Sequence, residues 1–138
     1  MSVSTSGGGA IPVTLTPPDD CASASISPDD TQIAYFGQVE NSTIFLANVD
    51  GYGEKVLVQI QHYEIEDLLL PALNVIWSPN GERLAIVSES AYLPGYGVLY
   101  LIDSDGNRGL EYVSSGPLDL VYPSLVSWSP DGEWLFFY

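Results

Sequence analysis

The sequence predicts an all-β protein built from repeated antiparallel sheets, and a recurring turn motif is the main evidence. Three copies share a serine, a proline and an Asp or Asn, and they lie 51 residues apart: Ser27-Pro28-Asp29-Asp30, Ser78-Pro79-Asn80-Gly81 and Ser129-Pro130-Asp131-Gly132. Ser, Pro, Asp and Gly in this order are typical of a type I turn that ends in a residue with positive φ. Because apolar runs flank every copy, each one predicts the turn of a β-hairpin.

A second type of turn completes the repeating unit. Asp50-Gly51 and Asp105-Gly106 each follow an apolar run, and Asp-Gly between β-rich runs predicts another hairpin turn. Each full unit therefore contains four strands, joined by a Ser-Pro turn, a loop and an Asp-Gly turn. Four-stranded units that recur at roughly this interval are typical of the blades of a β-propeller.

The runs between the turns give the strands in order. Residues 21–26 enter the first Ser-Pro turn and 32–37 leave it, while 43–49 enter the first Asp-Gly turn and 55–60 leave it. The second unit repeats this order, and the third copy of the Ser-Pro turn adds one more hairpin. We therefore predict ten strands, over residues 21–26, 32–37, 43–49, 55–60, 73–77, 83–88, 98–103, 109–114, 125–128 and 134–138.

The repeat also predicts the organisation of the chain. We expect a Ser/Gly-rich leader and the last strand of a preceding blade in residues 1–20, a blade in 21–60, an acidic connecting loop in 61–72, a blade in 73–114, and the first two strands of a third blade in 115–138. A propeller needs roughly 4 to 8 blades to close. The sequence therefore predicts an incomplete propeller, a fragment of a longer propeller protein, with self-assembly of several chains as the alternative.

Bulky apolar residues just before the Ser-Pro turns are predicted core positions. Trp77 and Trp128 are expected to wedge between adjacent blades, because an indole buries a large apolar area. Ile26 takes the same place in the first unit. A second set of equivalent positions follows the turns: Ile33, Leu84 and Leu135.

The segment Trp-Ser-Pro-Asp-Gly-Glu-Trp-Leu, from Trp128 to Leu135, resembles the WD-repeat-like β-propeller repeats of the TolB type. It is also similar to repeats in the propeller domains of the prolyl oligopeptidase and dipeptidyl peptidase IV group. The resemblance extends from Ala22 to the C-terminus and departs from the pattern at Ile26 and Asp30. It implies a scaffold, lid or binding platform, and it favours an extracytoplasmic location, although the chain shows no signal-peptide pattern.

Two classes of function fit these observations. The main hypothesis is a non-catalytic scaffold or binding module. The alternative is the propeller portion of an enzyme, either an S9-type serine peptidase or a propeller lyase or hydrolase, whose catalytic residues lie outside this chain. His62 is the only histidine and there is no Gly-x-Ser-x-Gly elbow, so neither a triad nor an activated serine can be argued. We expect no catalytic residue and no cofactor here.

Charge and hydropathy limit the partners. Eighteen acidic residues against three basic ones give a net charge of −15, which disfavours nucleic acid because phosphate binding needs Lys and Arg. No apolar run reaches the length of a membrane span, so we expect no membrane insertion. The expected partner is a protein or the remaining blades of the same propeller, and open strand edges could allow self-association.

Two carboxylates are weak candidates for a metal site. Asp103 and Asp105, next to Gly106, superficially resemble a calcium loop. A true loop needs a bidentate Glu at its twelfth position, where this chain has Ser114. A hairpin turn explains the pair fully, so no metal is expected.

Weak binding candidates lie between the strands. Tyr92 and Tyr96 are predicted on a loop, where an aromatic ring could contact a ligand. Glu64, Glu66 and Asp67 cluster on the acidic connecting loop, where two carboxylates could bind a cation or exchange a proton. A solvated acidic loop is the favoured explanation of this second group.

Overall fold

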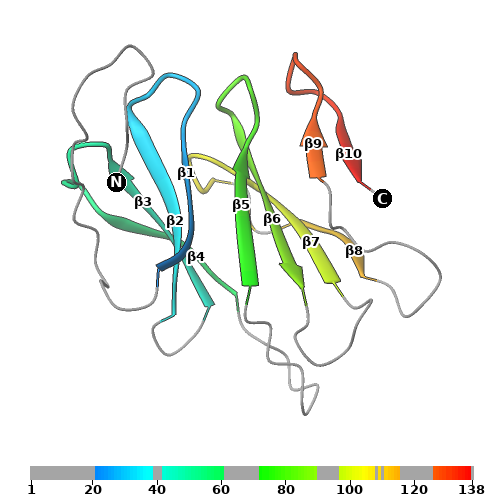
Figure 1. The fold of residues 1–138 in the computed structure, drawn as a ribbon, viewed down its shortest axis with the longest axis horizontal. Coiled ribbons are helices and arrows are strands. Elements are labelled where there is room, and N and C mark those ends of the chain that lie inside the picture. The colour runs from blue at the N-terminus through cyan, green and yellow to red at the C-terminus, as the bar shows by residue number, and fades with distance from the viewer. Residues whose placement is uncertain are drawn as a thin grey trace.

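The fold was obtained as a computed structural model (Figure 1), which describes residues 21–38, 42–60, 72–89, 97–107, 109, 111–115 and 126–137. The strand predicted before residue 21 lies outside these residues. Of the connecting loop predicted over 61–72, only Ala72 is described, and it begins a strand. The domain boundaries that fall on other residues stay predictions.

Ten β-strands make up the described part of the chain, and all neighbouring strands are antiparallel. The first sheet has the order β1 (Cys21–Ile26), β2 (Gln32–Gln38), β3 (Ser42–Asn48), β4 (Lys55–Ile60). The second sheet has the order β5 (Ala72–Trp77), β6 (Arg83–Glu89), β7 (Gly97–Asp103), β8 (Glu111–Ser115). The C-terminal hairpin pairs β9 (Val126–Trp128) with β10 (Leu135–Phe137). The ten predicted strands are confirmed, with bounds that differ by at most two residues.

The register confirms that the units repeat. The residue before each Ser-Pro turn pairs with the residue seven positions later: Ile26 with Ile33, Trp77 with Leu84, and Trp128 with Leu135. Cross-strand partners project from the same face of a sheet. The three hairpins therefore present the same pair of positions to the same side of their sheets.

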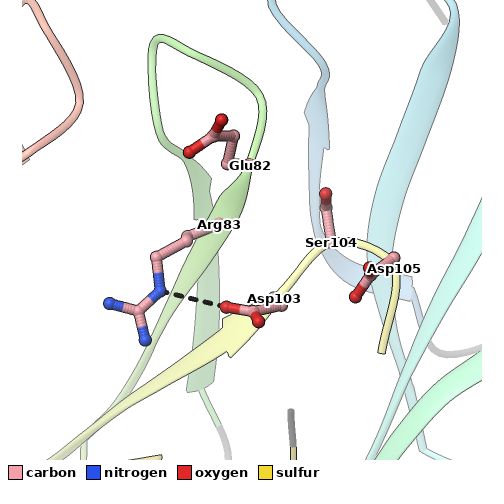
Figure 2. A pocket seen from close by; sticks show the side chains of 5 residues that line it. All are labelled: Glu82, Arg83, Asp103, Ser104 and Asp105. Carbon is pink, nitrogen blue, oxygen red and sulfur yellow. Dashed lines mark ion pairs between the residues drawn. The ribbon is translucent and has the colours of Figure 1, made fainter. Parts of the chain in front are cut away.

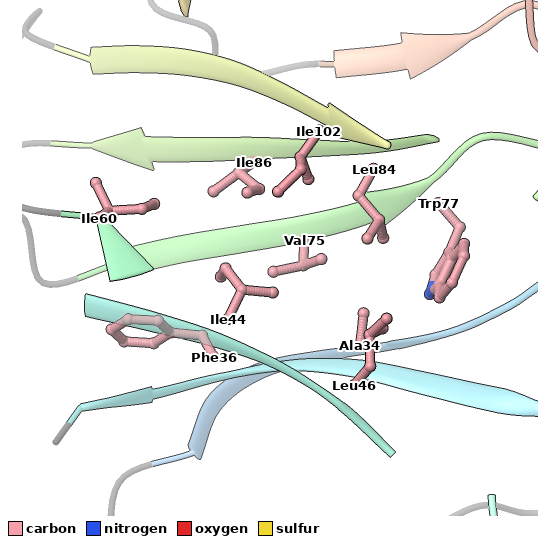
Figure 3. Close-up of a cluster of buried hydrophobic side chains, with 10 residues drawn as sticks. All are labelled: Ala34, Phe36, Ile44, Leu46, Ile60, Val75, Trp77, Leu84, Ile86 and Ile102. Atoms are coloured by element: carbon pink, nitrogen blue, oxygen red, sulfur yellow. The ribbon is translucent and has the colours of Figure 1, made fainter. Parts of the chain in front are cut away.

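Alternate residues of a strand point to opposite faces of its sheet. The apolar side chains on facing sides of neighbouring sheets therefore meet and form the core. One cluster lies between the first and second sheets and contains Ala34, Phe36, Ile44, Leu46, Ile60, Val75, Trp77, Leu84, Ile86 and Ile102 (Figure 3). A second cluster lies between the second sheet and the C-terminal hairpin and contains Ala85, Val87, Leu99 and Leu101, with Ile76, Trp128 and Leu135 packed against them. The sheets are therefore stacked face to face.

A third cluster covers the other face of the first sheet. It contains Ile33, Tyr35, Phe45 and Ala47, all buried. The rings of Tyr35 and Phe45 stack with centroids 5.3 Å apart. The Tyr35 hydroxyl donates a hydrogen bond to the Glu54 carboxylate in the turn between β3 and β4, so its polar end is satisfied.

Each interface between sheets also carries a tryptophan hydrogen bond. The indole Nε1 of Trp77 donates to the backbone oxygen of Ser25, 3.0 Å away, and Nε1 of Trp128 donates to the backbone oxygen of Ile76 at 3.4 Å. Ser25 and Ile76 are equivalent residues of successive sheets. The wedge role predicted for both tryptophans is thus confirmed: each packs in an inter-sheet cluster and donates to the preceding sheet.

The prediction that Ile26 is a core residue is wrong. Its register matches that of the tryptophans, but its side chain is 42% exposed. Its partner Ile33 belongs to the third cluster, on the face of the first sheet that does not pack against the second sheet. Trp77 and Trp128 each pack against the preceding sheet, whereas no described sheet packs against Ile26. Ile26 is therefore not a core residue.

We expect Trp77→Ala to lower the free energy of unfolding by roughly 3–5 kcal/mol, because it leaves a cavity between two sheets. Chemical denaturation followed by circular dichroism measures this. Ile26→Ala is the matched control at the equivalent position and should cost less than about 1 kcal/mol, because that side chain is already half in solvent. Similar losses for the two variants would show that Trp77 is not a wedge.

Candidate functional site

The three Ser-Pro turns lie together at one end of the stacked sheets, at the top of Figure 1. We call this surface, formed by residues 27–31, 78–82 and 129–133, the turn end. Asp30 has φ of 58°, and Gly81 and Gly132 have φ of 74° and 76°. All three turns therefore end in the left-handed conformation that the sequence pattern predicts, and Asp30 adopts it despite its side chain.

The serine of each turn holds its hairpin closed. Its hydroxyl accepts a hydrogen bond from the backbone N–H five residues later, at 2.9 Å in all three copies. It also donates to the Asp or Asn two residues later: Ser27 to Asp29 at 2.6 Å, Ser78 to Asn80 at 2.7 Å, and Ser129 to Asp131 at 2.5 Å. All three serines are buried, so both hydrogen-bonding directions of each hydroxyl serve the turn.

These hydrogen bonds stabilise the ionised form of two aspartates. The Ser27 hydroxyl, with the side chain and backbone of Thr31, holds the pKa of Asp29 below its ordinary value. The Ser129 hydroxyl and the Glu133 N–H do the same to the pKa of Asp131. A hydrogen bond donated to a carboxylate favours its charged form. Asp29 and Asp131 therefore keep their negative charge to a lower pH than a free aspartate does.

A shallow groove separates the first two Ser-Pro turns. It has a volume of about 310 Å³, and its walls include the rings of Pro28, Pro79 and Trp77, with Asp29 and Gln32 beside them. Between the second and third turns, the Asn80 side chain lies close against Gly132.

A polar cavity of about 400 Å³ lies beside the second turn and is lined by Glu82, Arg83, Asp103, Ser104 and Asp105 (Figure 2). The Arg83 guanidinium points to Asp103, with Nε 3.3 Å from a carboxylate oxygen, and its Nη2 lies 2.8 Å from Glu111. The backbone N–H of Ser104 donates to the backbone oxygen of Glu82, and its hydroxyl donates to the backbone oxygen of Gly81, both at 2.9 Å. These bonds fasten the Asp-Gly turn of the second sheet to its Ser-Pro turn.

The two metal candidates, Asp103 and Asp105, do line one cavity. The Asp103 carboxylate faces the guanidinium of Arg83, and the Asp105 carboxylate accepts hydrogen bonds from the backbone and side chain of Asn107 at 2.8 and 2.6 Å. The bond from the Asn107 backbone is the main reason that the pKa of Asp105 is lowered. Within the described ranges, no three His, Cys, Asp or Glu residues cluster as metal ligands would. Both aspartates thus have structural partners, and the metal hypothesis stays untested.

The binding candidates predicted from the loops, Tyr92, Tyr96, Glu64, Glu66 and Asp67, lie outside the described residues, as does His62. They stay predictions.

Sequence reasoning missed the central residue of the polar cavity, Arg83. It stands directly opposite Asp103 in the β6–β7 ladder, and the repeat frame could have revealed that pairing. Opposite charges at facing positions of two strands attract each other.

In the described part of the chain, no helix is long and apolar enough to cross a membrane.

Stacked, four-stranded antiparallel sheets with a repeated inter-sheet contact define an all-β fold of the propeller type. Among solved structures, TolB from Acinetobacter baumannii is similar to this chain, with a TM-score of 0.56 and 20% sequence identity over 86% of this chain and 26% of the TolB chain. The chain therefore spans about a quarter of the length of that protein. No family model and no curated protein sequence matches.

The likeness to TolB concerns the fold. It confirms the predicted TolB-like β-sheet architecture, and at this identity it carries no statement about activity. The predicted similarity to WD repeats and to propellers of the peptidase group stays a prediction.

The lowered pKa values predict an acid-sensitive contribution to stability. Because the folded-state pKa of Asp29 and of Asp131 lies below the unfolded value of 3.8, this contribution is present above about pH 4 and lost as the pH falls through the folded pKa. A variant carrying Asp29→Asn and Asp131→Asn should therefore lose less stability than the wild type between pH 6 and pH 2.5, by urea denaturation at each pH.

The second turn supplies the reciprocal control, since Asn80 already stands in the aspartate position. Asn80→Asp should make stability fall more steeply with acid. Equal pH profiles for wild type and both variants would mean that the serine hydroxyls do not stabilise these carboxylates.

Proposed function

We propose that this chain is part of a TolB-like β-propeller and serves as a non-catalytic scaffold or binding module. In this proposal, residues 21–60 and 73–114 are two full blades, the C-terminal hairpin begins a third, and the propeller is completed outside the chain. The repeated inter-sheet contact is the observation that carries it. The same indole-to-carbonyl bond joins the first sheet to the second and the second to the hairpin.

The side chains of the turn end support a structural role rather than a catalytic one. The three buried serine hydroxyls are engaged within their own turns, and Arg83 is engaged by Asp103 and Glu111. Each hydroxyl also accepts from the backbone N–H five residues later, so its hydrogen bonds close its own hairpin. These described groups thus hold the hairpins in place.

The proposed partner is a protein, or the remaining blades of the same propeller. The net charge of −15 disfavours nucleic acid, since it repels phosphates over the whole surface. Large apolar side chains exposed at one end of the stack, Trp134 and Phe136, favour a protein surface as the contact. The alternative, the propeller portion of an enzyme, places all catalytic groups on another part of the polypeptide.

We expect the purified chain to hydrolyse neither peptides nor esters above the buffer rate, measured with fluorogenic peptide libraries and nitrophenyl esters. The reason is that the three described Ser-Pro serines are engaged within their own turns, and the sequence has one histidine and no nucleophile-elbow motif. Turnover that disappears in His62→Ala would contradict the proposal. Turnover that appears only when the chain is joined to a further hydrolase domain would support the enzyme alternative.

A further inference from the structure

One position differs sharply between the hairpin and the two complete sheets. Ala34 in β2 and Ala85 in β6 are equivalent residues, and both are fully buried. The residue 51 positions further on is Phe136 in β10, and its side chain is 61% exposed. A small residue in the two complete sheets has thus become a large aromatic one in the hairpin, where it faces solvent.

Each alanine lies beside the acceptor of an indole: Ala34 is the cross-strand partner of Ser25, and Ala85 is that of Ile76. Ala34 belongs to the cluster that contains Trp77 and Leu84, and these residues lie on facing sides of that cluster in Figure 3. Ala85 belongs to the cluster that receives Trp128 and Leu135. At both interfaces, the earlier sheet contributes a methyl group and the later sheet contributes the indole. This division of volume lets the two sheets approach closely.

Phe136 points away from the second sheet. Leu135, its neighbour in β10, packs against the second sheet, and alternate residues of a strand project to opposite faces. Trp134, which comes just before β10, is also exposed, at 67%. We call the side of the hairpin that carries Phe136 its outer face. It continues the series of faces that, in the first and second sheets, are covered by the next sheet.

We propose that the outer face of the hairpin is the docking surface for a further sheet of the same propeller, and that this sheet carries a residue smaller than Trp at its wedge position. This inference rests on the proposed function. Phe136 already fills the space that the indole of Trp77 or Trp128 fills at the other two interfaces. A tryptophan opposite it would overpack the interface, whereas an isoleucine or valine would restore the fit.

The chain itself carries a residue smaller than Trp at one of its three wedge positions. Ile26 occupies the wedge position of the first sheet, in the same register as Trp77 and Trp128. A sheet with such a residue gives up the indole-to-carbonyl bond. The acceptor that the repeat would use on the hairpin is the backbone oxygen of Ser127, which corresponds to the oxygens of Ser25 and Ile76.

A second copy of the chain is the competing occupant, since its Ile26 is itself smaller than Trp. On the face that carries Ile26, however, Ile33, Tyr35 and Phe45 are buried without a second copy. The occupant we infer is a further sheet of the same propeller, because the first and second sheets each receive the next sheet of the same chain on the equivalent face.

An extended chain tests the inference directly. Residues 88–138 are appended after Tyr138, which keeps the 51-residue period, completes the third sheet and adds a fourth hairpin. The appended copy of Trp128 then becomes the wedge residue opposite Phe136. Four extended proteins are compared by urea denaturation. Two keep Phe136 and two carry Phe136→Ala, and within each pair the appended wedge position holds either Trp or Ile.

With Phe136 present, the Ile wedge should give the higher urea midpoint, by roughly 0.5 M, since it relieves overpacking. With Phe136→Ala, the Trp wedge should give the higher midpoint, because the alanine restores the arrangement of the other two interfaces. An effect of the wedge that is the same in both backgrounds would overturn the inference.

The existing interface between the second sheet and the hairpin provides an independent test in the unextended chain. Ala85→Phe should lower the urea midpoint, and adding Trp128→Ile should recover part of the loss, although Trp128→Ile alone is destabilising. If no stability is recovered, a large residue at the alanine position does not require a smaller wedge residue opposite it, and the inference is wrong whether or not the extended chains fold.

Light scattering of the 138-residue chain tests whether a second copy of the chain, rather than a further sheet, occupies the outer face. A dimer that dissociates in Phe136→Ser would identify a second copy of the chain and overturn the occupant proposed here. None of these measurements depends on hydrolysis, so a failure of this inference is distinguishable from a failure of the proposed non-catalytic function.

Discussion

The structure depends on the tryptophan that wedges between successive sheets. An antiparallel sheet of four short strands cannot bury enough apolar surface alone, so it must stack on a neighbour. That contact needs an apolar side chain between the sheets and an acceptor for its polar group. The ring of Trp77 packs in the cluster that contains Ala34, and its Nε1 donates to the backbone oxygen of Ser25 at 3.0 Å. A buried indole without that acceptor would leave an unpaired polar group, which is costly. Trp128 repeats the arrangement at the next interface.

The Ser-Pro turns determine where that wedge stands. The serine hydroxyl fixes both ends of the turn by accepting from the backbone N–H five residues later and donating to the Asp or Asn within it. The wedge residue comes immediately before the serine, so the same bonds set the register between Trp77 and Leu84. The polar side chains of the turns thus hold the wedge residues of the core in position. The described surface carries the carboxylates of the turn end and, at the last hairpin, the exposed aromatic side chains of Trp134 and Phe136.

The elements were predictable from the sequence because their signals are local and recur. Ser78-Pro79-Asn80-Gly81 forms its turn through bonds among its own residues and their close neighbours, so the pattern alone is sufficient. The exposure of Ile26 was not predictable, since burial depends on what lies beside the sheet rather than on register. At the candidate site, the bond from Asn107 to Asp105 is a local turn feature, whereas the Arg83–Asp103 pair requires the strand ladder. The size exchange at Phe136 becomes visible only when burial is compared across all three units.

The exchange rate of the indole protons tests the wedge most directly, because each of the three tryptophans has its own indole N–H resonance. In a hydrogen–deuterium exchange series followed by two-dimensional NMR, the Nε1 proton of Trp77 should exchange about a hundredfold or more slowly than that of Trp134, whose side chain is 67% exposed. The Trp128 proton should also be protected, but less so, because its hydrogen bond is 3.4 Å long. Equal exchange rates for Trp77 and Trp134 would contradict the account, since the indole of Trp77 would then not be held between the two sheets.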